Sequence, residues 1–127
     1  ILNRVKAPYN IGGLTQQTAL ALLRQYDLFQ NRRTGIILER ERLIRELRGL
    51  GIFRRVYDSE ANFILVITEF CQKLYRYLIA CRVVVRLRDI PPLIGGGIRI
   101  TVGTREENDR LLEVLHEYDN VMEVNTL

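Results

Sequence analysis

The residues of this chain best suited to chemistry are arginines placed inside two predicted strands. Arg99 lies between Ile98 and Ile100, and Arg86 and Arg88 alternate with apolar residues upstream. A guanidinium binds a carboxylate or a phosphate through two parallel hydrogen bonds, and it is costly to desolvate without such a partner. If Ile98 and Ile100 face a core, Arg99 points to the opposite face of its strand. The pattern indicates either an anion-binding surface or exposed arginines that pair with acidic neighbours.

A self-contained set of catalytic residues is absent from the sequence. The chain has one histidine and two cysteines, and it contains no Gly-x-Ser-x-Gly sequence and no phosphate-binding loop of the Gly-x-x-x-x-Gly-Lys type. His116, Cys71 and Cys81 do not match the spacing of a zinc site, and two cysteines are too few for a disulfide framework. We therefore expect reduced thiols, no metal site and no catalytic residue within this chain.

The composition limits the class of protein. The chain has 127 residues, of which 47% are hydrophobic and 27% charged, with a formal net charge of +4. It can bury the core of one compact domain. No apolar run approaches the roughly 18 to 20 residues of a membrane helix, so we expect a cytoplasmic protein without a membrane partner. The arginines lack interleaved aromatic residues, which argues against a nucleic-acid partner. The start at Ile1, without a methionine, suggests a piece of a longer protein.

The predicted elements alternate in a mixed order. Apolar periodicity, turn residues and glycines predict helices at 15–29 and 36–50, strands at 53–57 and 62–67, a helix at 70–81, strands at 83–87 and 97–102, and a helix that follows Thr104 and frays after Asn120. Thr104 and Glu107 form a capping box at the start of the last helix. This order predicts an α+β fold in which a small, mostly antiparallel sheet has helices covering one face.

Three predicted helices carry apolar stripes suited to packing. The first stripe consists of Ala19, Leu22, Leu23, Tyr26 and Phe29, the second of Ile37, Leu43, Ile44 and Leu47, and the last of Leu111, Leu112, Leu115 and Tyr118. The charged residues of the second helix are expected to face mostly outward, into solvent, namely Glu39, Arg40, Arg42, Arg45 and Arg48.

Four runs of residues resemble histidinol-phosphate aminotransferases in order and in spacing. They are residues 6–11 (Lys-Ala-Pro-Tyr-Asn-Ile), 57–63 (Tyr-Asp-Ser-Glu-Ala-Asn-Phe), 85–89 (Val-Arg-Leu-Arg-Asp) and 98–108 (Ile-Arg-Ile-Thr-Val-Gly-Thr-Arg-Glu-Glu-Asn). The last run is the most specific, because other fold-type I aminotransferases share the strand arginine but seldom the residues that follow it. The resemblance covers nearly the whole chain.

The resemblance implies a homodimeric enzyme that uses pyridoxal 5'-phosphate. Its lysine for the cofactor lies upstream of the run that contains Lys6, so this chain would lack it and be inactive alone. Residues 1–30 would be the end of the large cofactor domain with a connecting helix, and residues 31–127 the C-terminal small domain. The reaction would interconvert L-histidinol phosphate and 2-oxoglutarate with imidazole-acetol phosphate and L-glutamate, in histidine biosynthesis.

By the same resemblance, Arg99 and Arg88 would bind the anionic group of the substrate. That group is the α-carboxylate of glutamate in one half-reaction and the phosphate of histidinol phosphate in the other. Tyr9, Asn10 and Asn62 match family positions near the domain junction. The loop at residues 90–96 departs from the family pattern because it is more apolar.

Two alternatives remain open at this stage. Another fold-type I enzyme, such as a threonine-phosphate decarboxylase or an aromatic aminotransferase, would also use Arg99. A free-standing α+β binding module would instead be a complete gene product, so the sequence upstream of Ile1 would separate the two.

Overall fold

The computed structural model of the chain describes residues 11–88 and 96–124. Its internal contacts divide the chain into two units, Ile1–Thr34 and Gly35–Leu127, with the boundary inside a helix. The predicted division into the domains of a longer enzyme, at residue 30, stays a prediction. No helix in the described ranges is both long enough and apolar enough to cross a bilayer.

The first unit contains α2 (Gly13–Leu23) and the beginning of α3 (Tyr26–Arg48). The single helix predicted from Thr15 to Phe29 is therefore wrong: the chain leaves the helix at Arg24, and Phe29 already donates its N–H to the carbonyl of Gln25 in the next one. The predicted gap before residue 36 is wrong too. Gly35 lies inside α3, because one glycine costs a helix only about 1 kcal/mol relative to alanine.

The apolar stripe of the first unit does not pack on a core within the described chain. No residue of α2 is buried. Large apolar side chains from both helices are exposed, among them Leu14, Leu20, Leu22, Leu23, Tyr26 and Phe29. Within its own unit, this stripe therefore has no core to pack on.

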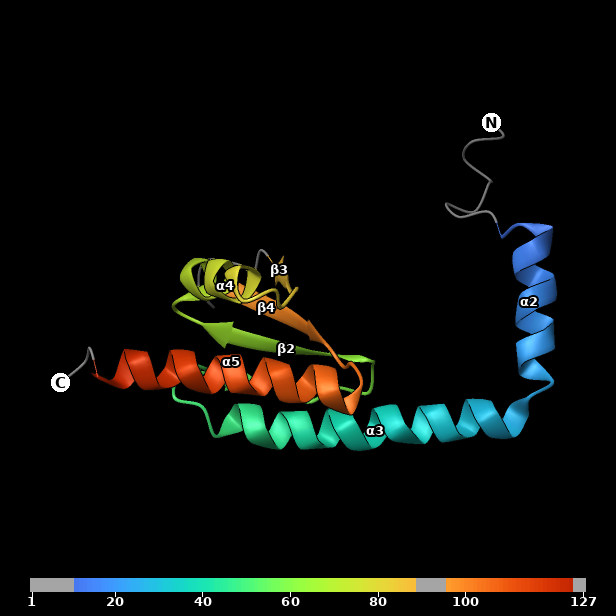
Figure 1. Cartoon of the computed structure of the whole chain (residues 1–127), viewed down its shortest axis with the longest axis horizontal. Coiled ribbons are helices and arrows are strands. Elements are labelled where there is room, and N and C mark those ends of the chain that lie inside the picture. Colours follow the sequence, from blue (N-terminus) through green and yellow to red (C-terminus); the bar gives the residue numbers. More distant parts are fainter. Residues whose placement is uncertain (1–10, 89–95, 125–127) are drawn as a thin grey trace. The chain divides into compact units, whose positions relative to one another are not determined.

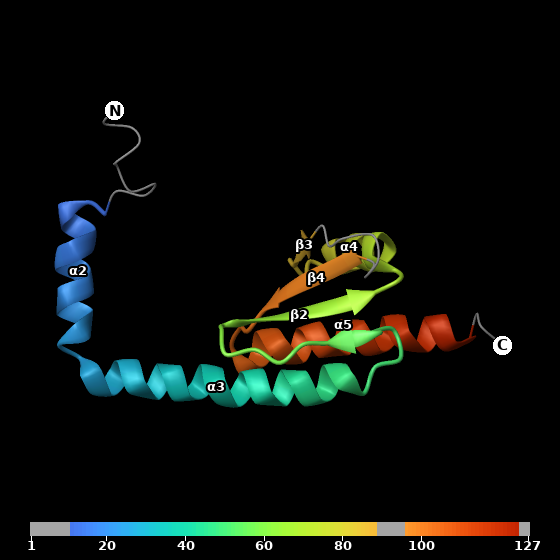
Figure 2. The same ribbon diagram turned by 180° about the vertical axis from the view of Figure 1, so that it is seen from behind.

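The second unit is built on a four-stranded sheet with the order β1-β2-β4-β3, in which every pair of neighbours is antiparallel. The strands are β1 (Arg55–Val56), β2 (Phe63–Thr68), β3 (Arg86–Arg88) and β4 (Gly96–Thr101), and the helices that follow β2 and β4 are α4 (Cys71–Ala80) and α5 (Arg105–Val124). The predicted order of helices and strands is confirmed, as is the α+β class. Figure 1 shows α5 running beside the second half of α3, and Figure 2 shows the sheet in front of α5.

One face of the sheet forms the core with these helices. Ile64, Val66, Ile98 and Ile100 point into it from the two central strands and are at most 2% exposed. The helices contribute Leu43 and Leu47 from α3, Leu74 and Leu78 from α4, and Leu111, Leu112, Leu115 and Tyr118 from α5. The predicted core stripes of the second and last helices are thus confirmed, except that Ile37 is only half-buried.

A buried carboxylate ties the end of α3 to α5. Asp119 accepts hydrogen bonds from the backbone N–H groups of Gly51 and Ile52, at 3.1 and 2.9 Å. Hydrogen bonds to a charged acceptor are the stronger kind, and this pair anchors α5 near its end. The helix continues to Val124, four residues beyond Asn120.

The turn that follows α4 decides where β3 begins. Arg82 donates its N–H to the carbonyl of Ile79 at 2.9 Å, and Val83 donates to Leu78 at 2.8 Å, which is the Schellman pattern of a helix end. Because this cap uses the backbone of residues 82 and 83, the strand predicted at 83–87 cannot start there, and β3 starts at Arg86. Arg82 has φ of 62°, a left-handed conformation at a position where glycine is preferred.

Replacing Arg82 with glycine should stabilise the chain. A left-handed residue with a side chain costs about 1 to 2 kcal/mol, and part of this gain is lost to the greater freedom of unfolded glycine, so we expect about 0.5 to 1 kcal/mol. Urea unfolding of the chain measures this difference. Arg82→Ala is the control, since it removes the same side chain but keeps the strained backbone. An equal gain in both variants would show that the side chain, and not the conformation, is responsible.

Candidate anion-binding site

The register of the sheet places Arg99 on the face opposite the core. Its neighbours across the two ladders are Leu65 on β2 and Arg86 on β3. Ile98 and Ile100, on either side of it in β4, are buried in the core. The expectation that Arg99 points away from the core is therefore confirmed.

Arg86, rather than Arg88, lies directly across from Arg99. Arg88 pairs with Gly97 and so lies diagonally from Arg99. In an antiparallel pair, direct partners have Cβ atoms about 4.5 to 5.5 Å apart, whereas diagonal neighbours are about 7 to 8 Å apart. Two facing positive charges destabilise a sheet unless an anion lies between them. Sequence periodicity put Arg86 and Arg88 on one face, but only the register distinguishes their distances to Arg99.

No carboxylate neutralises these arginines in the part of the chain that the structure describes. The ion pairs found there involve Glu39, Asp58, Glu69, Asp109 and Glu113, and none includes Arg86, Arg88 or Arg99. Asp89, the acidic residue that follows Arg88, lies outside the described residues, so pairing of these arginines with it stays an alternative prediction.

The Arg99 side chain is half-buried and partly constrained. Its Cζ lies 5.0 Å from the ring centroid of Phe63, and its Nε is buried without a hydrogen-bond partner among the described residues. A buried donor without an acceptor costs about 1 to 3 kcal/mol, and such a group in a native structure is a reason to look for function.

Arg88 lines a cavity at the other end of β3. A cavity of about 690 Å³ is lined by Leu87, Arg88, Gly96 and the first part of α4 with the two residues before it, namely Glu69, Phe70, Cys71, Gln72 and Lys73. Neither Arg86 nor Arg99 lines it. The two arginines that the resemblance joins, Arg88 and Arg99, are thus on the same face but not around one cavity of the described chain.

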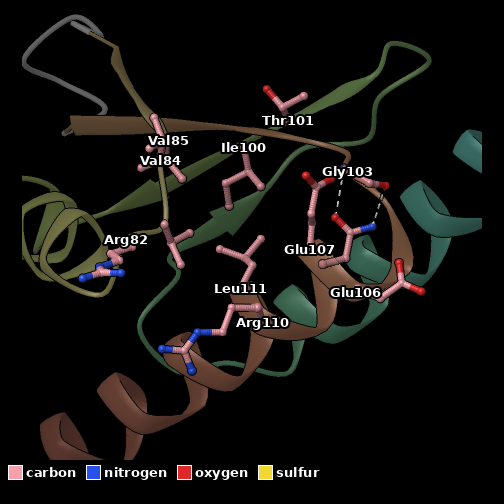
Figure 3. Close-up of a pocket in the computed structure, with 12 residues that line it drawn as sticks. Arg82, Val84, Val85, Ile100, Thr101, Gly103, Glu106, Glu107, Arg110 and Leu111 are labelled. Carbon is pink, nitrogen blue, oxygen red and sulfur yellow. Dashed lines mark hydrogen bonds between the residues drawn. The ribbon is translucent and has the colours of Figure 1, made fainter.

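A second cavity, of about 590 Å³, lies away from these arginines (Figure 3). Val83, Val84 and Val85 form one wall, β4 and the start of α5 form others, and Arg82 and Arg110 lie at its margin. Its lining is mostly apolar, and it includes none of Arg86, Arg88 and Arg99. It therefore takes no part in the candidate site.

The end of β4 is fixed by a network around Asn108. The predicted capping box is confirmed, since Thr104 N–H donates to Glu107 Oε2 and Glu107 N–H to Thr104 Oγ1, at 2.8 and 3.3 Å. Asn108 is 1% exposed and makes both hydrogen bonds to the backbone of Gly103 that are drawn in Figure 3. This arrangement holds the turn four residues after Arg99.

Glu39 connects α3 to that network. It accepts hydrogen bonds from Arg42 at 2.7 Å and from Asn108 Nδ2 at 2.9 Å, and Arg42 also pairs with Asp109. The Arg42 hydrogen bond, followed by that of Asn108, lowers the pKa of Glu39 below its usual 4.5. The prediction that Glu39 and Arg42 face solvent is wrong, because their side chains are only 15% and 18% exposed.

Of Tyr9, Asn10 and Asn62, only Asn62 lies among the described residues. Asn62 is exposed, and its carbonyl accepts the N–H of Val102 at 2.9 Å, which closes the sheet next to β2. Tyr9, Asn10 and residues 90–95 of the apolar loop lie outside the described residues. Within the described ranges, no group of histidine, cysteine and acidic side chains could hold a metal. Cys71 and Cys81 are not joined by a disulfide, and Cys71 Sγ donates to the carbonyl of Gly97 at 3.4 Å.

Acid should destabilise the chain partly through Glu39. Because its folded pKa is lowered, Glu39 stabilises the fold above its unfolded pKa of about 4.5, and that stability is lost as the pH falls through the folded pKa. Urea unfolding at pH 7 and at several values below 4.5 should therefore show a smaller acid loss in Glu39→Gln than in the unchanged chain. Glu113→Gln, which removes an exposed ion pair with Arg110, is the control and should behave like the unchanged chain. Identical acid profiles for all three proteins would contradict the role of Glu39.

Comparisons with known proteins identify the family of the chain. Residues 1–115 match the family described as aminotransferase class I and II. The chain is 42% identical over 116 residues to a histidinol-phosphate aminotransferase of Flavobacterium psychrophilum, covering 91% of this chain and 33% of the relative. It is also 42% identical over 118 residues to one of Cytophaga hutchinsonii, covering 93% and 34%. The chain thus spans about a third of the length of these curated relatives.

Solved structures share the arrangement of elements. A histidinol-phosphate aminotransferase from Clostridium acetobutylicum matches with a TM-score of 0.77 and 27% identity, over 94% of this chain and 36% of that one. A decarboxylase from Sulfurospirillum multivorans matches with a TM-score of 0.72 and 26% identity, over 87% and 33%. The same fold therefore occurs in a protein named as an aminotransferase and in one named as a decarboxylase.

Proposed function

Since the chain belongs to the aminotransferase class I and II family, we propose that it is the substrate-anion-binding part of a histidinol-phosphate aminotransferase. The reaction is the transfer of an amino group between L-histidinol phosphate and 2-oxoglutarate, which gives imidazole-acetol phosphate and L-glutamate. The observation that carries this proposal is the cross-strand pair of Arg99 and Arg86, which has no carboxylate partner in the described chain.

Arg99 is the principal residue in this proposal. Its guanidinium would bind the α-carboxylate of glutamate in one half-reaction and the phosphate of histidinol phosphate in the other. Both anions present oxygens at a spacing that suits the guanidinium fork. A second guanidinium would share the charge of the phosphate. The resemblance assigns that second role to Arg88, and the sheet register adds Arg86 as the nearer candidate.

The cofactor of the family, pyridoxal 5'-phosphate, would provide the electron sink for the amino transfer. The described residues do not fit the attachment of this cofactor. Their one lysine, Lys73, is exposed on α4, whereas a lysine that forms an imine needs a buried, shaped site that lowers its pKa. We therefore propose that the cofactor is held by the rest of the protein and that this chain binds and orients the substrate.

The wider assembly follows from the same family. We propose that residues 1–30 end the cofactor domain, that residues 31–127 form the small domain, and that the whole enzyme is a cytoplasmic homodimer acting on small molecules. The exposed apolar residues of α2 support packing of the first unit on other parts of such an enzyme.

A second candidate is a decarboxylase of the same fold, because a solved decarboxylase shares the arrangement of elements. Such an enzyme would also need an arginine for an anionic substrate. Assay of the full-length enzyme for release of CO₂ from amino-acid phosphates, alongside transamination of histidinol phosphate, distinguishes the two. Absence of transamination of histidinol phosphate would rule out our first choice.

Removal of the Arg99 guanidinium should weaken the binding of both substrates. A charge-assisted hydrogen bond is worth about 1.5 to 3 kcal/mol, so Arg99→Ala in the full-length enzyme should lower kcat/KM roughly 10- to 150-fold for glutamate and for histidinol phosphate. Steady-state kinetics with each substrate measures this. Normal turnover of glutamate would contradict the carboxylate role.

Two matched variants test which second arginine assists Arg99. Arg86→Leu and Arg88→Leu each remove one positive charge from β3. If the nearer residue assists, Arg86→Leu raises KM for histidinol phosphate more than Arg88→Leu does. The opposite order would support the assignment by resemblance.

The chain by itself should not form a stable imine with pyridoxal phosphate. After mixing at equal concentrations and dialysis, we expect no absorbance band that borohydride removes, because the only lysines are Lys6 and the exposed Lys73. Lys73→Arg is the control for reaction at the surface. A band that survives dialysis in both proteins and disappears on reduction would overturn the proposal that the cofactor lysine lies elsewhere.

A further inference from the structure

The Arg99 side chain is held from one side by an aromatic ring. Phe63 pairs with Thr101 and Leu65 pairs with Arg99, so Phe63 is the diagonal neighbour of Arg99 on the same face of the sheet. The Cζ atom of Arg99 lies 5.0 Å from the ring centroid of Phe63, within the range of a cation–π contact. The ring therefore covers one side of the guanidinium.

The rest of the Arg99 side chain is also restricted. Its Nε atom, which belongs to the guanidinium, is buried, so this edge of the group lies against protein. An arginine has many rotamers, and a ligand that must select one of them binds more weakly. A contact that holds the guanidinium before the ligand arrives reduces that loss of binding.

We propose that Phe63 is a positioning residue for Arg99, which holds the guanidinium in the orientation that receives the carboxylate or phosphate of the substrate. This inference rests on the proposed function, in which Arg99 binds that anion. Phe63 touches Arg99 and acts through it. It therefore affects the affinity for the anion and not the chemical step.

The same sheet offers a matched control. Arg55 on β1 lies over the ring of Tyr57, with Cζ at 4.4 Å from the centroid. This second cation–π contact is of the same kind, but Arg55 pairs with Ile67 and is not a neighbour of Arg99 in the sheet. Loss of the Tyr57 ring should leave substrate binding unchanged.

The experiment uses the full-length enzyme with Phe63→Leu, Phe63→Tyr and Tyr57→Leu. Phe63→Leu should raise KM for glutamate and for histidinol phosphate about three- to tenfold, with kcat within about twofold of the unchanged enzyme. Phe63→Tyr keeps the ring and should restore KM, and Tyr57→Leu should leave it unaltered. Phe63→Met, which keeps apolar volume without a ring, replaces Phe63→Leu if thermal unfolding shows that the leucine variant does not fold.

Histidinol, which lacks the phosphate, separates positioning from a structural role. Phe63→Leu should reduce the preference for histidinol phosphate over histidinol, whereas a general defect in packing would lower activity on both by the same factor. An unchanged preference, or an unchanged KM in a folded variant, would overturn the proposal for Phe63.

A double-mutant cycle distinguishes failure of this inference from failure of the proposed function. If Arg99→Ala alone leaves KM for both anionic substrates unchanged, the proposed function of Arg99 is wrong. If Arg99→Ala raises KM and Phe63→Leu does not, only the positioning role is wrong. If both hold, Phe63→Leu should add little in the Arg99→Ala background, because its effect passes through Arg99.

Discussion

The antiparallel pairing of β4 with β2 and β3 is the constraint on which the rest of the structure depends. Successive side chains of a strand point to opposite faces, so the register that buries Ile98 and Ile100 necessarily turns Arg99 outward. A slip by one residue would exchange the two faces. The free energy of burying the isoleucines therefore also keeps Arg99 on the face opposite the core, where the proposed function needs it.

On the core side of the sheet, the packed helices stabilise this register. Leucines of α3, α4 and α5 cover the inner face, while Asp119 anchors α5 to the end of α3 and Asn108 fixes the turn after β4. Glu39 joins α3 to that turn. These polar contacts are few, but each satisfies backbone or charged groups that burial would otherwise leave without partners. Among the described residues, the arginines of the opposite face have no ion-pair partner, and this difference between the faces supports the proposed anion-binding role.

Membership of the aminotransferase family supports the function proposed for the face of the sheet that carries Arg99. In the proposed enzyme, amino transfer needs a cofactor, which the described residues do not fit, and a means of holding two different anionic substrates, which Arg99 and its neighbours fit. The chain spans about a third of the length of its relatives. In the proposed enzyme, this third binds the substrate, and another part of the protein holds the cofactor.

The sequence by itself determined the order of the elements, the core stripes of the later helices, the capping box at Thr104 and the outward direction of Arg99. These features depend on local periodicity and local hydrogen bonds, which a sequence displays directly. It missed the continuity of α3 through Gly35, the start of β3 and the burial of Glu39. Only the tertiary structure decided that Arg86 lies directly beside Arg99 and that Phe63 lies against its guanidinium. Cross-strand register and ring contacts join residues far apart in the chain, and no local pattern encodes their distances.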